Sequence, residues 1–446
     1  MAKARSVLML VENQVVPVDP RVWLEARALR DAGFRVSVIS PKGTAAYRAP
    51  YECIEGIHIY RYRLPAGRTA VAYLAEFAVA LAMTFWLSAK VWRRHGVDVI
   101  HAGNPPDIFF PIAYVYRLCG AKFVFDQHDL APELFQVLFA RRLPSGVAAL
   151  LHRLLVFFER CSYRAADLVI VTNDSFRQIA MDRGGCVARK VVVVRNGPDL
   201  TRFRPVPPDP ALKQGRPYLL AYVGIMGVQD GIEYALRALD VLVHRRGRRD
   251  IALVLVGDGA HAPALRTLAH ALRLDEYVTF TGWVSPAEVA RYLSPADVGL
   301  APEPYNALNN ASTMIKTMEY MALGIPVVAF DLKETHYSAR GAGRYATPNS
   351  IEDLATKVED VLADDGLRRG MGAEGRKRVE DVLSWKYSAE RLLRAYDELC
   401  AATPATPVGG RPGGHDRAED VSALNAAGGG SLAVDRRCDR QRGVRA

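Results

Sequence analysis

Three polar residues in the second half of the chain have a spacing that suits a binding site. Ser312, Lys316 and Glu319 are separated by four and three residues, so a helix would carry them on one face. A carboxylate there can accept hydrogen bonds from both ribose hydroxyls, and an ammonium group can meet phosphate charge. The spacing favours a nucleotide site, although a capped helix with an internal Lys–Glu pair would show it too.

Two glycine-rich loops precede this segment, and each follows an apolar run that predicts a strand. The first loop is GIMGVQDG at 224–231, and the second contains Gly257 and Gly259. Such loops can bring backbone N–H groups and a helix N-terminus to a diphosphate, although ordinary tight turns also use glycine. The loops and the polar helix therefore predict one anion-binding region.

The elements that must position these residues are strands alternating with helices, which is typical of parallel sheets covered on both faces. One set of strands ends near Gly197, and a second set starts at Tyr218 after a Pro-rich segment without periodicity. The predicted strands lie at 6–11, 35–40, 97–101, 122–126, 167–172, 190–195, 218–223, 251–256, 278–281, 298–301 and 326–330.

The chain has 446 residues, which is too many for one core, so two Rossmann-like domains are expected. Residues 1–200 form the predicted first domain, 201–217 the linker and 218–384 the second domain. Helix 385–400 is amphipathic and is expected to cross back to the first domain. The Gly-rich tail 401–446 has almost no large apolar residues and is expected to be disordered.

This organisation favours transfer between two ligands. Open parallel sheets bind ligands beyond the carboxyl ends of their strands, so two facing sheets form a cleft with two half-sites. The loop at 12–21 lacks the glycines of a dinucleotide site, and no phosphate-binding P-loop motif is present, which argues against redox and ATP-driven kinase chemistry.

Composition narrows the partners further. The formal net charge of +10 suits anionic ligands, but no nucleic-acid motif accompanies it, so no nucleic-acid partner is predicted. The six cysteines are scattered without metal-site spacing, and we predict no metal and no cofactor.

Two apolar segments bear on localisation. The stretch 69–89 contains a single charge, Glu76, and fits a buried helix or a membrane span. The basic, aromatic-rich segment 150–160 fits a packed helix or a membrane-surface helix. No signal peptide is visible, so we expect a cytoplasmic protein, with peripheral contact at the inner face of the plasma membrane as an option.

Several motifs together resemble a known family. EYMALGIPVVA at 319–329, VGIMGVQDGIE at 223–233 and LVGDG at 255–259 resemble the retaining GT-B glycosyltransferases of family 4. The resemblance covers roughly residues 6–400 and includes DPRVWLEA, DQHDLAPE, ADLVIVTN and VVVRNGPD. It is strongest to the bacterial cell-surface polysaccharide branch that includes N-acetylfucosamine transferases.

The resemblance implies a GT-B fold of two doubly wound domains facing across a cleft, and transfer with retained anomeric configuration. The second domain would hold a UDP- or GDP-sugar, and the first would hold a glycan or lipid-linked acceptor.

His128 matches a family histidine that faces the donor sugar, although a buried structural histidine is the alternative. The catalytic candidates are His128, Lys316 and Glu319. The implied acceptor-side residues are Arg21, Asn104 and Asp129. The implied donor site comprises Gly224, Gly227, Asp230, Gly231, Gly257, Gly259, Asn310, Ser312, Thr313, Lys316 and Glu319.

Two departures from the family pattern affect the site. The first of two family glutamates falls at Ala311, and Asn309, Asn310, Glu303 or a backbone group can replace it. The basic pair of the first donor loop is replaced by Met226 and by Gln229 or Asp230, which leaves Lys316 as the substitute cation. We expect a hexosyl- or N-acetylhexosaminyltransferase. An epimerase of the same fold and a non-catalytic scaffold remain alternatives.

Overall fold

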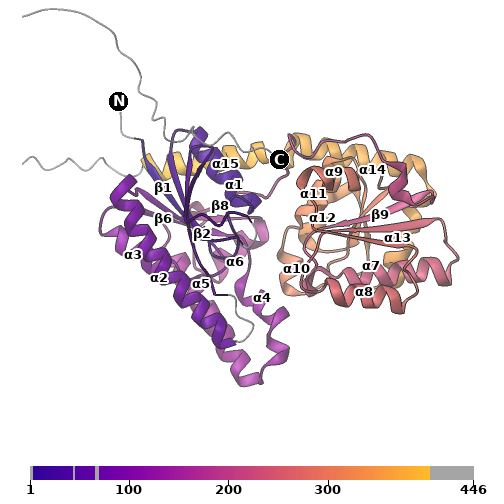
Figure 1. Cartoon of the computed structure of the whole chain (residues 1–446), viewed down its shortest axis with the longest axis horizontal. Coiled ribbons are helices and arrows are strands. Elements are labelled where there is room, and N and C mark those ends of the chain that lie inside the picture. Colours follow the sequence, from indigo (N-terminus) through magenta and orange to yellow (C-terminus); the bar gives the residue numbers. More distant parts are fainter. Residues whose placement is uncertain (1–3, 44–45, 66–69, 402–446) are drawn as a thin grey trace, which may run out of the picture.

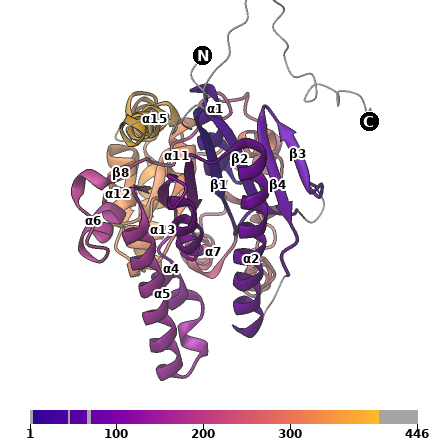
Figure 2. The ribbon, with the colours of Figure 1, turned by 90° about the vertical axis from the view of Figure 1, so that its left-hand side faces the viewer.

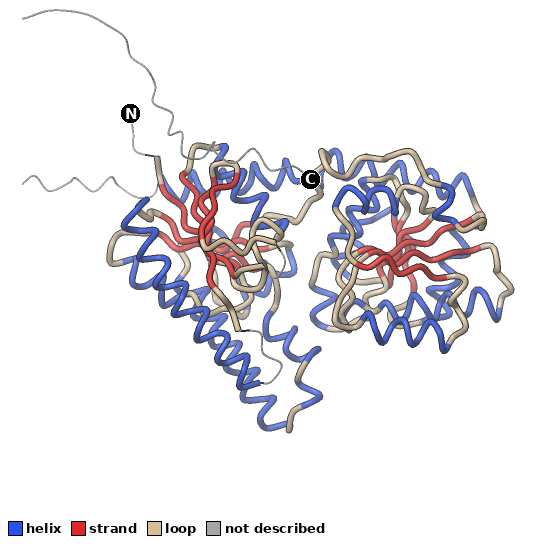
Figure 3. Tube along the Cα trace, viewed as in Figure 1, coloured by secondary structure: helices blue, strands red, loops and turns tan. Residues whose placement is uncertain are grey.

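The structure is a computed structural model that describes residues 4–43, 46–65 and 70–401, and it contains two sheets. The first has the order β3-β4-β2-β1-β5-β6-β7-β8 and is parallel except for the β3–β4 pair. Figure 1 shows the two sheets side by side, and Figure 3 shows helices on both faces of each. The strands of the first sheet are β1 (Ser6–Leu10), β2 (Arg35–Pro41), β3 (Tyr51–Ile54), β4 (Ile57–Tyr62), β5 (Val99–Gly103), β6 (Lys122–Gln127), β7 (Leu168–Val171) and β8 (Val191–Val193).

Alternation along β1 shows how the first sheet buries both faces. Leu8 and Leu10 pack into one apolar cluster, and Val7 and Met9 pack into another, as the two-residue period of a strand requires. Helices in this part of the chain are α1 (Pro20–Asp31), α2 (Ala70–His95), α3 (Phe110–Arg117), α4 (Ala131–Leu138), α5 (Ser145–Ala165) and α6 (Asp174–Asp182).

The second sheet has the order β11-β10-β9-β12-β13-β14, with every pairing parallel. Its strands are β9 (Tyr218–Val223), β10 (Ile251–Val256), β11 (Val278–Gly282), β12 (Val298–Ala301), β13 (Val327–Phe330) and β14 (Gly343–Ala346). Its helices include η4 (Val228–Asp230), α7 (Ile232–Asp240), α8 (Ala262–Ala271), α9 (Pro286–Leu293), α10 (Ala307–Ala311), α11 (Ile315–Ala322), α12 (Lys333–Ala339), α13 (Ile351–Ala363) and α14 (Asp365–Arg378).

The last helix, α15 (Trp385–Ala401), lies on the first sheet, as Figure 1 shows. Leu392, Tyr396 and Cys400 pack in the same cluster as Val7 and Met9. The chain therefore passes between the sheets twice, once before β9 and once before α15. The predicted tail, apart from residue 401, lies outside the described residues.

The two apolar segments are both helical. Apart from Thr69, which lies outside the described residues, the stretch 69–89 falls within α2, whose Ala80, Leu87 and Val91 pack into the first-domain core. Across the described ranges, no helix has the length and apolar character needed to span a membrane. The segment 150–160 lies in α5, which extends past the sheet in Figure 2 and exposes Leu150 and Phe157. Membrane contact there stays a prediction.

Candidate active site

The two glycine-rich loops pack against each other beyond the ends of β9 and β10. Gly224 and Gly257 have φ angles of +142° and +129°, which disfavour any side chain. A Cβ on Gly257 would lie 2.0 Å from the Gly224 carbonyl oxygen, and one on Gly259 would lie 2.6 Å from that of Met226. The glycines therefore allow backbone-to-backbone contact, and Gly231, with φ of +64°, starts α7.

Lys316 lies on α11 and is buried beneath the first loop. Its Nζ pairs closely with Glu303, lies 3.1 Å from the Tyr222 hydroxyl and 3.5 Å from Asp230 Oδ1. Burial alone would lower the pKa of Lys316, but Glu303, Tyr222 and Asp230 raise it well above its usual range. Burial raises the pKa of the Glu303 carboxyl, although Lys316 opposes the shift. Lys316 is thus a permanent cation beside two acidic groups.

Asp230 also holds the loop itself. Its Oδ2 accepts a hydrogen bond of 3.0 Å from the Gly227 N–H, while its Oδ1 faces Lys316. The carboxylate therefore engages one amide and one ammonium group that an anionic ligand would also use. Met226, which stands where the family has a basic residue, is uncharged and fully buried, so this position offers no cation to a ligand.

Glu319 lies one turn after Lys316 and has a different environment. Its side chain is partly exposed, and no hydrogen bond to it is present within the described ranges. Burial raises the pKa of the Glu319 carboxyl to about 7, against the opposing charges of Lys316 and Arg202. It is an available carboxylate at the second-domain surface.

Ser312 departs from the predicted arrangement. The helix begins at Ile315, and Ser312 follows the end of α10 with an extended backbone (φ −91°, ψ 139°). The prediction that it shares a helical face with Lys316 and Glu319 is therefore wrong. Its hydroxyl donates to the Leu308 carbonyl at 2.8 Å, so it closes the short helix α10.

The neighbouring candidates make structural contacts. Asn310 Oδ1 accepts a 3.0 Å hydrogen bond from the Lys333 N–H. Thr313 Oγ1 accepts one of 3.0 Å from Asn173 of the first domain. Asn309 is buried and donates to the carbonyl oxygens of Gln229 and Pro304. Of the three side chains considered for the missing glutamate, Glu303 alone is a carboxylate, and it touches Lys316.

His128 lies at the facing edge of the first sheet, directly after β6. Its N–H donates to Asn104 Oδ1 at 2.6 Å, and its Nε2 lies 2.5 Å from Asp126 Oδ2. The Asn104 side chain also bonds the backbone N–H and C=O of Asp129. A Cβ on Gly103 would lie 3.0 Å from the imidazole Cε1, so this glycine leaves room for the ring. His128 is thus fixed at its backbone and at one ring nitrogen.

Arg21 contacts Asp126, the residue that holds the His128 ring. It is 5% exposed, and its guanidinium bonds both oxygens of Asp126, at 2.6 and 3.1 Å. It also donates to the Val194 carbonyl and to Asn196. The structure directs the Arg21 guanidinium inward, against these partners.

The two domains contact each other next to His128 and the first glycine loop. Helix α4, which follows Asp129, contacts both η4 and α10, and Leu308 packs into the first-domain core. Burial raises the pKa of Asp129, and Asp230 on the opposite domain adds to the shift while His128 opposes it. His128 and Asp129 therefore face the loop that carries Asp230.

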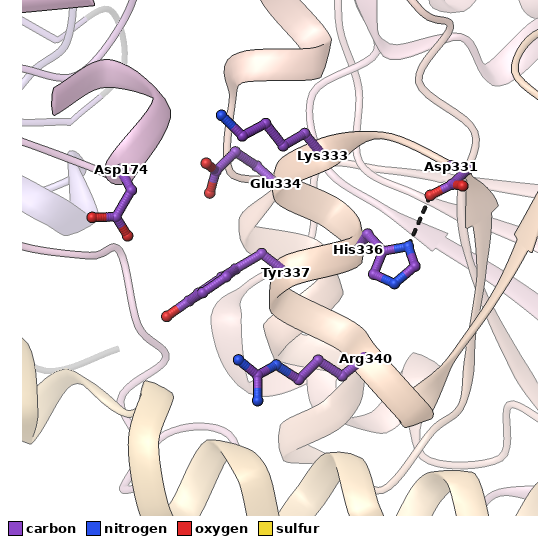
Figure 4. Close-up of a pocket in the computed structure, with 7 residues that line it drawn as sticks. All are labelled: Asp174, Asp331, Lys333, Glu334, His336, Tyr337 and Arg340. Atoms are coloured by element: carbon purple, nitrogen blue, oxygen red, sulfur yellow. Dashed lines mark hydrogen bonds and ion pairs between the residues drawn. The ribbon is translucent and has the colours of Figure 1, made fainter. Parts of the chain in front are cut away.

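A second contact between the domains was not predicted. Glu334 of α12 is buried, accepts a 2.7 Å hydrogen bond from the Ser175 hydroxyl and lies 3.4 Å from Arg195. It borders a cavity of about 710 Å³, where Figure 4 shows Glu334 and Tyr337 projecting towards Asp174. One feature of the sequence could have indicated this contact. Residues 173–175 come directly after a predicted strand, where loops of parallel sheets bind ligands.

Two family models match the chain, one in each domain. Residues 18–197 match the glycosyl transferase 4-like domain, and residues 217–364 match glycosyl transferases group 1. An uncharacterized glycosyltransferase of Methanocaldococcus jannaschii is 28% identical, over 83% of this chain and 91% of that protein. An alpha-maltose-1-phosphate synthase of Mycolicibacterium smegmatis is 26% identical, over 64% of this chain and 75% of that protein.

Solved structures share the architecture. Sucrose-phosphate synthase from Thermosynechococcus elongatus superposes with a TM-score of 0.71 at 20% identity, over 90% of this chain and all of that one. Anabaena HepE, in a complex with UDP and glucose, gives a TM-score of 0.65 at 15% identity, over 88% of this chain and all of that one. The predicted GT-B architecture of two doubly wound domains is confirmed. The chain is therefore a GT-B glycosyltransferase, built from a glycosyl transferase 4-like domain followed by a glycosyl transferases group 1 domain.

Proposed function

We propose that the chain transfers a sugar from a nucleotide-sugar donor to an acceptor hydroxyl, with retention of the anomeric configuration. Glu319 carries the proposal: it is an unpartnered carboxylate beside the buried cation Lys316 and the paired glycine loops. A carboxylate accepts hydrogen bonds from both hydroxyls of a ribose, and loop N–H groups donate hydrogen bonds to phosphate oxygens. The donor then lies against the second domain, with its sugar directed at His128 and Asp129.

The donor is a UDP- or GDP-sugar. Supporting this, HepE is described in complexes with UDP, with UDP and glucose, and with UDP-glucose, and one relative is a GDP-mannose-dependent mannosyltransferase of Mycobacterium tuberculosis. A glycan or lipid-linked acceptor is supported by WaaG, a structural neighbour involved in lipopolysaccharide biosynthesis.

In the proposed mechanism the bond between the anomeric carbon and the diphosphate oxygen breaks first. Lys316 and the loop amides stabilise the charge that develops on the leaving diphosphate. The acceptor oxygen bonds the anomeric carbon on the same face, and its proton passes to the leaving phosphate. Glu303 takes the place of the missing family glutamate by holding Lys316 beneath the loop, and Asp230 gives up its contact with Lys316 when the donor binds.

The test is a donor screen. Purified protein is incubated with a panel of nucleotide sugars and a crude lipid-linked acceptor extract, while release of nucleoside diphosphate is followed. We expect release from one donor, and a loss of at least about tenfold in Glu319→Ala and in Lys316→Ala. An epimerase would convert the donor without releasing diphosphate. No release, together with no thermal shift by any nucleotide, would favour a non-catalytic scaffold.

A further inference from the structure

A buried polar network extends from Asp126 away from the cleft to the last helix of the chain. His101, on β5, is 1% exposed, and its Nε2 lies 3.3 Å from Asp126 Oδ2 and 3.4 Å from Glu25 Oε2. Its other ring nitrogen, Nδ1, lies 2.7 Å from the Tyr396 hydroxyl on α15. Asp126 in turn bonds His128, so four side chains connect α15 with the cleft.

The positions of the protons in this network follow from its chemistry. Burial, with Glu25 and Asp126 nearby, raises the pKa of Tyr396 well above its usual range, so its hydroxyl keeps its proton and donates to His101. Burial lowers the pKa of His101, so the ring is neutral. A neutral imidazole that accepts at Nδ1 carries its proton on Nε2, which therefore points at Asp126 and Glu25.

Asp126 is the acceptor on which this network converges. Burial alone would raise its pKa, but Arg21 and His128 hold it well below its usual range, so the carboxylate is ionised. Burial raises the pKa of Glu25 well above its usual range, although Arg21 opposes the shift. Asp126 therefore balances the charge of Arg21, and Glu25 keeps its proton. Glu25, Asp126 and His128 lie close enough together to hold a metal ion, but Arg21 already supplies a cation to both carboxyl groups.

We propose that Tyr396 and His101 are positioning residues for His128: acting through Asp126, they hold the imidazole with Nε2 bonded inward and Nδ1 available to the donor sugar. The inference rests on the proposed function, because it concerns the residue that faces the donor. The carboxylate attracts the Nε2 side of the His101 ring, 3.3 Å from Asp126 Oδ2, so this contact favours one orientation of Asp126 and hence of the ring that Asp126 holds. The last helix thereby supports the active site through these buried side chains.

Tyr396→Phe tests the proposal with little change in packing. The ring keeps its contacts with Phe34 and His101, at centroid distances of 5.6 and 6.1 Å, and only the donor to Nδ1 is lost. We expect kcat to fall about fivefold while the donor KM stays within about twofold. The acidic limb of the pH profile should move to higher pH, because the ionised form of Asp126 is less stabilised once His101 is free to change tautomer.

The pH effect has to be separated from other charges that face the network. Asp19, Arg21 and Glu25 approach from α1, and Asp129 and Asp230 approach from the cleft. None of these residues changes in the variant, so they contribute equally to both profiles.

Tyr116→Phe is the matched control. It removes another buried hydroxyl of the same domain, one that donates to Ser88 Oγ at 3.0 Å and has no connection to Asp126. We expect its kcat and pH profile to match those of the unmodified protein. Equal loss in both variants, or no change in kcat and pH profile in Tyr396→Phe, would overturn the proposal.

A second variant and a spectroscopic measurement do not depend on Tyr396→Phe folding well. Gly103→Ala crowds the His128 ring without altering any charge and should lower kcat in the same way. Ring-nitrogen NMR of unmodified protein should show His128 protonated at Nε2, and another tautomer would overturn the proposal. If no donor is turned over by any form, the proposed function fails while the NMR result still decides the proton arrangement.

Discussion

Two carboxylates of the second domain illustrate how burial and partners divide roles between identical side chains. Glu303 forms an ion pair with Lys316. Glu319 lies on α11 one turn after Lys316 and has no side-chain partner in the described structure. A partnered carboxylate organises its neighbours, and a free one beside a cleft is available to a ligand. The distinction supports the proposal that Glu319 binds the ribose.

The ionisation of Glu319 should make donor binding depend on pH. Its pKa is raised from 4.5 to about 7, and only the ionised form accepts both ribose hydroxyls. The donor KM should therefore fall about tenfold between pH 6 and pH 8, as the ionised fraction rises by that factor. Steady-state kinetics at fixed ionic strength measures this.

Glu319→Gln serves as the control for that pH dependence, since its amide does not titrate. Its donor KM should be higher than that of the unmodified protein at pH 8 and nearly constant between pH 6 and 8. A profile that keeps its slope in the variant would assign the titration to another group, such as Asp129.

The sequence predicted which residues belong to the candidate site, but not which side chains bond to one another. His128, Lys316 and Glu319 were identifiable because strand ends, glycine loops and family motifs mark them. The bond between Arg21 and Asp126 joins residues that are 105 positions apart, and no local pattern indicates it. The prediction that Ser312 lies on the same helix as Lys316 was wrong for a local reason. Asn306 caps a short helix that ends at Ala311, before α11 begins.

At the scale of elements, contact between the two glycine loops should stabilise the proposed donor site, and Gly257→Ala tests this. The new Cβ would meet the Gly224 carbonyl oxygen, and φ would be strained, so we expect a loss of about 3 kcal/mol in the free energy of unfolding. Nucleotide-induced thermal stabilisation should disappear as well. Chemical denaturation and thermal shift measure the two effects.

Gly247→Ala provides the comparison, because Gly247 also has a positive φ, +70°, but a Cβ there meets nothing within 4 Å. Its cost should be about 1 kcal/mol, from backbone strain alone, with nucleotide binding retained. Similar losses in both variants would mean that contact between the loops contributes little.

Some elements could not be predicted from periodicity. The β3–β4 hairpin turns through Glu55 and Gly56, with φ angles of +49° and +80°, and lacks the common Asn-Gly signal. Strand β14 is only Gly343–Ala346 and is recognisable mainly by its pairing with β13. The long apolar runs of the central strands, buried on both faces, were unambiguous.

For the whole molecule, Glu334 should couple the two domains. Removing it leaves Arg195, which is 6% exposed, with the exposed carboxylate of Asp174 and the ring of Tyr337, and breaking a buried pair in this way costs about 3 kcal/mol. We expect Glu334→Ala to split a single calorimetric transition into two. Asp174→Ala, whose carboxylate is 59% exposed, should change stability by less than about 1 kcal/mol and leave the transition single. A single transition in both variants would show that other contacts couple the domains.

The two passages between the sheets lie against each other. Trp385 N–H donates to the Pro198 carbonyl at 3.1 Å, and a Cβ on Gly197 would lie 2.0 Å from the Leu383 carbonyl oxygen. In terms of chain topology, residues 198–384 are therefore an insertion whose two ends meet at one seam. Exchanging that insertion for its counterpart from a relative would join the backbone at a single place in space, and the contacts of Leu308, Thr313 and Glu334 with the first domain would have to be matched. If the second domain binds the donor as proposed, the layout allows donor specificity to change as a unit, with α15 and its link to His128 left intact.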